Sequence, residues 1–123
     1  MNYIKIDINK IKKFRNIIIT NEVVLTKERE IHIYNNHKKD YKEIMKNIRN
    51  AIIEPNEIIE DLKNDATLFF IKRLKKNNLY VIIKLNTTNS VKHQKNSIMT
   101  AWIIRDKNLI KLEKKNKIIY KNT

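Results

Sequence analysis

The chain has 123 residues, which is enough for one domain with a modest hydrophobic core. Its formal net charge of +14 favours an acidic partner such as nucleic acid, although an excess of Lys over Arg and the absence of Gly are also typical of an AT-rich genome. No apolar run approaches the length of a membrane span, the first residues alternate between apolar and polar, and Cys is absent. We therefore expect a cytoplasmic protein without a membrane partner.

The first 25 residues contain short apolar runs. Residues 3–8 alternate apolar and polar side chains, and residues 17–19 and 23–25 are largely β-branched, so the sequence predicts short extended segments. Two helices are expected next. Thr26 is predicted to cap a helix that ends near Asn35. Asp40 is predicted to begin a second helix with Glu43 completing a capping box, and Pro55 follows its end.

After Pro55 the apolar period changes to two, which indicates strands. Asn77-Asn78 supplies turn chemistry between two of them. The predicted strands cover residues 58–59, 67–74, 79–86 and 97–104, and a last hairpin joins residues 109–112 to 118–120. Helices followed by an antiparallel meander predict a single α+β domain over residues 1–123.

Strict alternation assigns faces to two of these strands. Residues 81, 83 and 85 would face the core, and Ser97 would lie on the face opposite Ile98. The open face would carry Tyr80, Lys84, Ile98, Thr100 and Trp102. Two aromatic rings beside a Lys and a hydroxyl suit stacked bases and a phosphate. The alternative is that Trp102 is an ordinary core residue.

Charge is segregated along the chain. Ten of the 13 acidic residues lie between Glu22 and Asp65, and none lies between Ala66 and Arg105. Codon bias would add Lys throughout but would not remove acids from forty consecutive residues, so this segment is predicted to bind phosphates. Its basic residues are Lys72, Arg73, Lys75, Lys76, Lys84, Lys92, Lys95 and Arg105.

His32 and His37 lie on one short segment, and histidine changes charge nearest neutral pH. Without Cys, and with the third histidine in a Lys-rich loop, a metal site is not favoured, and we expect acid/base chemistry without a metal or another cofactor. Five helical residues turn through about 140°, so both rings can serve one site only if the helix ends before His37. The alternative is that both have structural roles.

Four features occur in the order and spacing of a known family. They are the Thr-x-Glu-Arg-x-x-His-Ile run at residues 26–33 with His37 after it, the Pro55-x-x-Ile58 step, the basic hairpin at residues 72–84 and the Ser-Ile-Met-Thr-Ala-Trp strand at residues 97–102. Together they cover residues 23–120 and resemble the phage-encoded branch of the barnase/EndoU/colicin/RelE-like (BECR) nucleases. Residues 1–22 lie outside the resemblance as an N-terminal extension.

The resemblance implies N-terminal helices packed on a four-stranded antiparallel sheet and a metal-independent ribonuclease, often a toxin that cuts tRNA or mRNA. It also implies a possible cognate inhibitor or immunity protein. The site would contain a helix histidine, a basic strand residue and a late hydroxyl, which correspond to His32, Lys84 (or Arg73) and Thr100 (or Ser97), with His37 in reserve. The alternatives are a non-catalytic nucleic-acid-binding protein and a small phage protein that inhibits a host protein.

Overall fold

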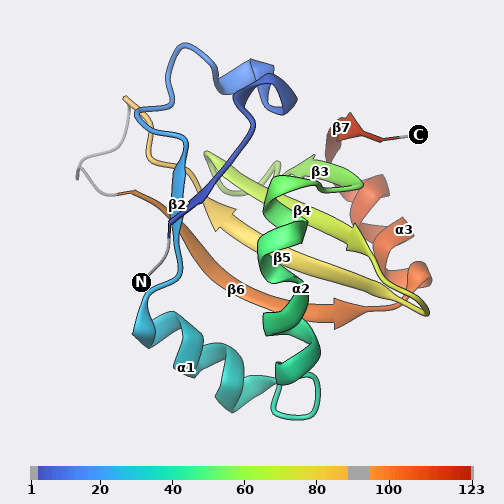
Figure 1. The fold of residues 1–123 in the computed structure, drawn as a ribbon. Coiled ribbons are helices and arrows are strands. Elements are labelled where there is room, and N and C mark those ends of the chain that lie inside the picture. The colour runs from blue at the N-terminus through green and yellow to red at the C-terminus, as the bar shows by residue number, and fades with distance from the viewer. Residues whose placement is uncertain (1–2, 89–94, 123) are drawn as a thin grey trace.

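A computed structural model describes residues 3–88 and 95–122, in which the strands form a mixed seven-stranded sheet (Figure 1). The strand order is β1-β2-β6-β5-β4-β3-β7, and neighbours are antiparallel except β2 and β6. The strands are β1 (Ile4–Lys5), β2 (Glu22–Val24), β3 (Glu57–Glu60), β4 (Thr67–Arg73), β5 (Asn78–Lys84), β6 (Asn96–Ile104) and β7 (Lys117–Lys121). The helices are α1 (Lys27–Asn36), α2 (Tyr41–Ile53) and α3 (Asp106–Lys115), with 3-10 turns η1 (Ile8–Lys10) and η2 (Lys12–Phe14).

The sheet is larger than the expected one. The prediction of a four-stranded antiparallel sheet is wrong, because β1 and β2 extend the β3–β6 meander on one side and β7 extends it on the other. The parallel step arises where Val23 pairs with Asn96. The apolar residues of the first segment explain the extension, since Ile6 and Ile11 are buried in the main core.

The two predicted helices form close to their expected bounds. The Thr26 hydroxyl caps α1 by accepting a hydrogen bond of 3.2 Å from the backbone N–H of Arg29. Asp40 precedes α2 but makes no side-chain capping bond, so the capping box does not form. No helix in residues 3–88 and 95–122 is long and apolar enough to cross a membrane.

A helix replaces part of the predicted last hairpin. Residues 109–112 lie in α3, and only residues 117–121 form a strand, which pairs with β3. The extended reading of residues 109–112 was wrong because Leu109 and Leu112, three residues apart, share one helix face and pack on the sheet. Asp106 in the first turn and lysines in the last turn match the helix dipole.

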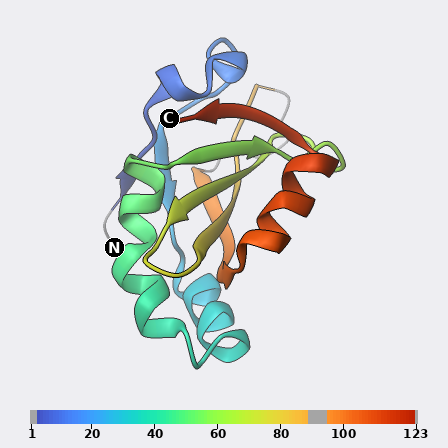
Figure 2. The ribbon, with the colours of Figure 1, turned by 90° about the vertical axis from the view of Figure 1, so that its right-hand side faces the viewer.

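The sheet separates two apolar clusters, because α2 and α3 lie on opposite faces (Figure 2). The larger cluster lies between the sheet and α2 and includes Ile44, Ile48 and Phe70. The smaller lies between the sheet and α3 and includes Phe69 and Tyr80. We call the α3 side the open face, since α3 covers only part of it.

A β-bulge in β6 changes which residues reach the open face. Ile82 pairs with Thr100, but its neighbour Ile83 pairs with Ile98, so Met99 is the extra residue. Ile98 and Ala101 both point into the larger core, although they are three residues apart. Strict alternation was therefore wrong for the start of β6, and Ser97 joins Thr100 on the open face.

A buried carboxyl lies beneath α3. Glu57 on β3 is only 7% exposed and interacts with Glu113 of α3, while Lys121, its partner on β7, lies 4.0 Å from the Glu113 carboxylate. Burial, and then the hydrogen bond with Glu113 and its charge, raise the pKa of Glu57 to about 7, while Lys121 opposes this rise. The folded protein consequently holds a proton here that the unfolded chain releases near pH 4.5.

This proton makes stability depend on pH. A raised pKa contributes stability that is fully present below the unfolded value and is lost as pH rises through about 7. We expect the free energy of unfolding, measured with urea, to fall by about 1–3 kcal/mol between about pH 5 and pH 8. Glu57→Gln should remove most of this fall, whereas Glu28→Gln, at an exposed position, should keep it. An unchanged fall in Glu57→Gln would contradict the assignment.

Candidate active site

Four rings stack in a row across the open face. The His37 and Trp102 centroids lie 5.5 Å apart, Trp102 and Tyr80 4.7 Å, and Tyr80 and Phe69 5.1 Å. Neighbouring planes are within 28° of parallel. The row follows the register of the sheet, because Tyr80 on β5 pairs with Trp102 on β6. Each such pair contributes about 0.5–1.5 kcal/mol beyond its buried area.

The two rings expected to bind bases, Tyr80 and Trp102, differ in how much of each ring is accessible. Tyr80 is 5% exposed and lies between Phe69 and Trp102, so its faces are occupied. Burial raises the pKa of Tyr80, and the charge of Asp61 adds to this effect, so the phenol stays protonated at neutral pH. Trp102 is half-buried and packs against both apolar clusters, so it belongs partly to the core and partly to the surface.

His37 reaches the open face because α1 ends one residue before it. Its backbone N–H closes the helix on the carbonyl of Ile33, and its φ of −139° and ψ of 47° are not helical. Partial burial lowers the pKa of the ring below 6.5, the charge of His32 adds to this, and Asp40 opposes it. The lowered pKa of His37 favours the neutral ring, the form that can accept a proton.

His32 lies on the exposed surface of α1. The Asn36 side-chain amide lies 3.2 Å from its Nδ1 atom and also donates to the His32 carbonyl at 2.9 Å. With the amide nitrogen as donor, Nδ1 accepts, and a neutral ring carries its proton on Nε2. The charge of His32 is the smallest of the three influences on the pKa of His37, so the two rings interact weakly through their charges.

A hydroxyl on the open face has no partner. The Oγ1 atom of Thr100 is buried and makes no hydrogen bond within the described part of the chain. An unpaired buried hydroxyl costs about 1–3 kcal/mol, which a ligand oxygen would offset. Ser97 and Lys84 pair across β6 and β5 nearby, and the Ser97 hydroxyl donates to the Lys95 carbonyl at 3.3 Å.

The two candidate cations lie at opposite ends of the paired strands β4 and β5. Lys84 is exposed, and its ammonium donates to the carbonyl of Asp65. Arg73 pairs with Asp106 at the start of α3 and donates to Asn78 at 3.2 Å. Asn78 and Lys84 are six residues apart on β5, or about 20 Å, so only Lys84 lies on the Thr100 side.

The other predicted phosphate-binding residues have mixed surroundings. The ammonium of Lys95 lies 2.6 Å from the Glu22 carboxylate and above the ring of Tyr3. Lys72 donates to the carbonyl of Glu54 at 2.7 Å. Lys75, Lys76 and Arg105 are exposed, and Lys92 lies outside the described residues.

A hollow between Trp102 and α3 adds residues that the sequence interpretation did not include. It has a volume of about 260 Å³, and Lys111 and Lys115 of α3 line it beside Trp102 and Tyr80. Lys111 and Lys115 were not recognised as a pair because this segment was predicted to form a hairpin rather than a helix. Lys111 and Lys115 share one helix face with Leu112, and this spacing was the available signal.

The family model described as phage-Barnase-EndoU-ColicinE5/D-RelE like nuclease2 matches residues 3–121. The chain belongs to this nuclease family. The match confirms the resemblance seen in the sequence and also includes most of the N-terminal segment that was placed outside it. Searches of curated proteins and of solved structures found no match.

The stack provides its own spectroscopic probe, because Trp102 is the single tryptophan of the chain. A protonated imidazole in contact with an indole quenches its fluorescence. We expect Trp102 emission to fall as pH decreases, with a midpoint below 6.5, because burial lowers the pKa of His37. His37→Gln should abolish this transition, and Lys39→Gln should retain it. A midpoint above 6.5 would contradict the assigned environment.

Proposed function

We propose that the protein is a metal-independent endoribonuclease whose active site lies on the open face, at the edge formed by α1 and β6. The observation that carries the proposal is the position of His37, which stacks on Trp102 on the same sheet face as the unpaired hydroxyl of Thr100. A nuclease activity already follows from the family; RNA as substrate and the mechanism below are our inference.

The reaction needs a base, an acid and stabilisation of charge. The ribose 2′-hydroxyl attacks the adjacent phosphorus, its proton passes to neutral His37, and the bond to the 5′ oxygen breaks. The imidazolium form of His32 protonates the leaving oxygen through Nε2 and is left as a neutral ring. Each positioned proton transfer contributes roughly 10²- to 10⁴-fold in rate. The products are a 2′,3′-cyclic phosphate and a 5′-hydroxyl.

Residues of β5 and β6 stabilise the negative charge on the phosphate. Lys84 offsets the negative charge that develops on the phosphoryl oxygens, which is a preorganised electrostatic role. Thr100 donates its free hydroxyl to one of these oxygens, and Ser97 assists from the next position along the open face. We extend the proposal to tRNA or mRNA as the substrate and to a cognate inhibitor as the partner.

The mechanism predicts that the protein cuts RNA in EDTA and leaves DNA of the same sequence intact, because the attacking group is the 2′-hydroxyl. Gel analysis with end mapping should show 2′,3′-cyclic phosphate ends. Loss of cleavage in EDTA with recovery on addition of Mg²⁺ would contradict the mechanism. RNA binding without cleavage under all conditions would favour a non-catalytic binding protein.

Both histidines should be needed for cleavage, but only His37 should determine the acidic limb of the pH profile. We expect His37→Ala and His32→Ala each to lower kcat/KM for RNA by about 10²- to 10⁴-fold, while RNA binding and the circular dichroism spectrum are retained. The acidic limb of the wild-type pH profile should lie below pH 6.5 and vanish in His37→Ala. Lys39→Ala is the matched control beside the site. Full activity of a folded His37→Ala protein would remove the assigned base.

A further inference from the structure

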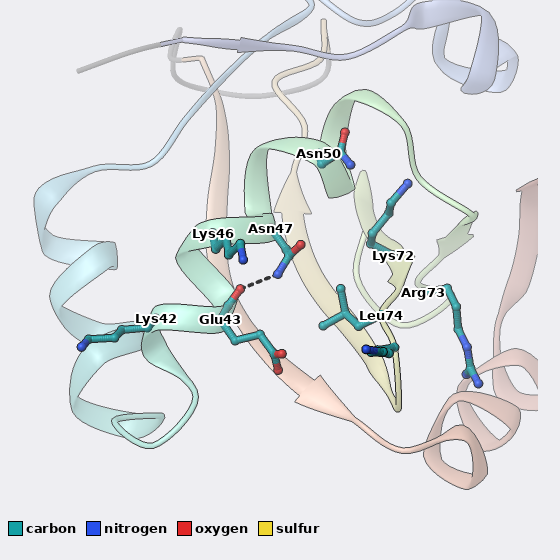
Figure 3. A pocket seen from close by; sticks show the side chains of 9 residues that line it. Lys42, Glu43, Lys46, Asn47, Asn50, Lys72, Arg73 and Leu74 are labelled. Carbon is teal, nitrogen blue, oxygen red and sulfur yellow. Dashed lines mark hydrogen bonds between the residues drawn. The ribbon is translucent and has the colours of Figure 1, made fainter.

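A cationic groove lies between α2 and the β4–β5 hairpin, outside the proposed active site (Figure 3). Its volume is about 590 Å³. Five basic side chains and one acid line it: Lys42, Lys46, Lys72, Arg73, Lys75 and Glu43. It therefore joins lysines of the acid-rich first half of the chain to those of the acid-free segment.

Three of these cations have neither an acidic partner nor a hydrogen-bond acceptor in the described residues, whereas Lys72 donates to the Glu54 carbonyl. Within residues 3–88 and 95–122, the ammonium groups of Lys42, Lys46 and Lys75 lie beyond ion-pair distance of any carboxylate. All three are exposed. Lys42 and Lys46 are four residues apart on α2, where like charges destabilise a helix. A polyanion in the groove would offset this repulsion.

The shape of the groove favours a strand over a small anion. Residues four apart on a helix advance by about 6 Å, so Lys42 and Lys46 form a row along α2 that can contact successive phosphates. Lys72 and Lys75 line the groove from the hairpin, and Figure 3 shows Lys72 across from Asn50 near the end of α2. The Asn47 amide donates to the Glu43 carbonyl at 2.8 Å, which leaves its oxygen for a ribose hydroxyl.

The groove also approaches the open face of the sheet. Arg73 lines it and pairs with Asp106 at the start of α3, the helix that borders the open face. A strand that leaves the groove at Arg73 therefore passes the end of the hairpin and reaches the hollow lined by Lys111 and Lys115. The groove and the hollow both lie near the turn of the β4–β5 hairpin.

We propose that this groove binds the sugar-phosphate backbone of RNA several nucleotides from the cleaved bond. The inference rests on the proposed ribonuclease function and adds a second binding surface to it. Phosphate contacts position a strand without reading its sequence, so the groove raises affinity for long RNA of any sequence. A dinucleotide is too short to reach it from the open face.

The test compares Lys42→Ala/Lys46→Ala with Lys12→Ala/Lys63→Ala, which removes the same charge from exposed positions outside the groove. The substrates are an RNA of about 25 nucleotides and a dinucleoside monophosphate. We expect the groove variant to bind the long RNA about tenfold more weakly in fluorescence anisotropy. Its slope of log affinity against log salt should fall by about 1.4, or roughly 0.7 for each lysine.

Cleavage separates this inference from the proposed function. The groove variant should raise KM for the long RNA, keep kcat, and cut the dinucleotide like the wild type. Equal effects of the two variant pairs on long-RNA affinity would overturn the groove, even if the enzyme is active. Equal weakening of binding to a poly-glutamate peptide would overturn the assignment to RNA. If no RNA is cut, the anisotropy comparison still decides whether the groove binds it.

Discussion

The register shift in β6 is the constraint on which the candidate site depends. One extra residue, Met99, lets Ile98 and Ala101 both enter the larger core, and the residues around the bulge face the other way. A slip of one residue exchanges the two faces of a strand, so an unbulged β6 would bury Ser97 or expose Ile98. The bulge brings Ser97, Thr100 and Trp102 to one face and bends the strand where the site lies.

Trp102 links this strand to the rest of the molecule. It packs against both apolar clusters, and its ring fixes the positions of His37 on one side and Tyr80 on the other. The end of α1 is thereby attached to the sheet through a side chain of the site itself. Loss of this ring would disturb packing and the histidine together, which is why conservative changes at His37 separate the two effects better.

Local signals were enough to predict part of this arrangement. The cap at Thr26, the apolar period of α2 and the paired asparagines at residues 77–78 act within a few residues, and each element forms near its expected bounds. The bulge, the parallel pairing of β2 with β6 and the docking of α3 depend on contacts between distant residues, which a period cannot reveal. His37 likewise gains its environment from Trp102, sixty-five positions away along the chain.

The cationic groove draws on both the acid-rich and the acid-free parts of the sequence. Within the acid-free segment, Arg73, Lys72 and Lys95 have protein partners in Asp106, the Glu54 carbonyl and Glu22. The acid-rich half supplies Lys42 and Lys46, which have no such partner in the described residues. Net charge of +14 draws a polyanion from a distance, but unpaired cations at a concave surface decide where it binds. The groove therefore combines the helical spacing of lysines on α2 with Lys72, Arg73 and Lys75 of the acid-free segment.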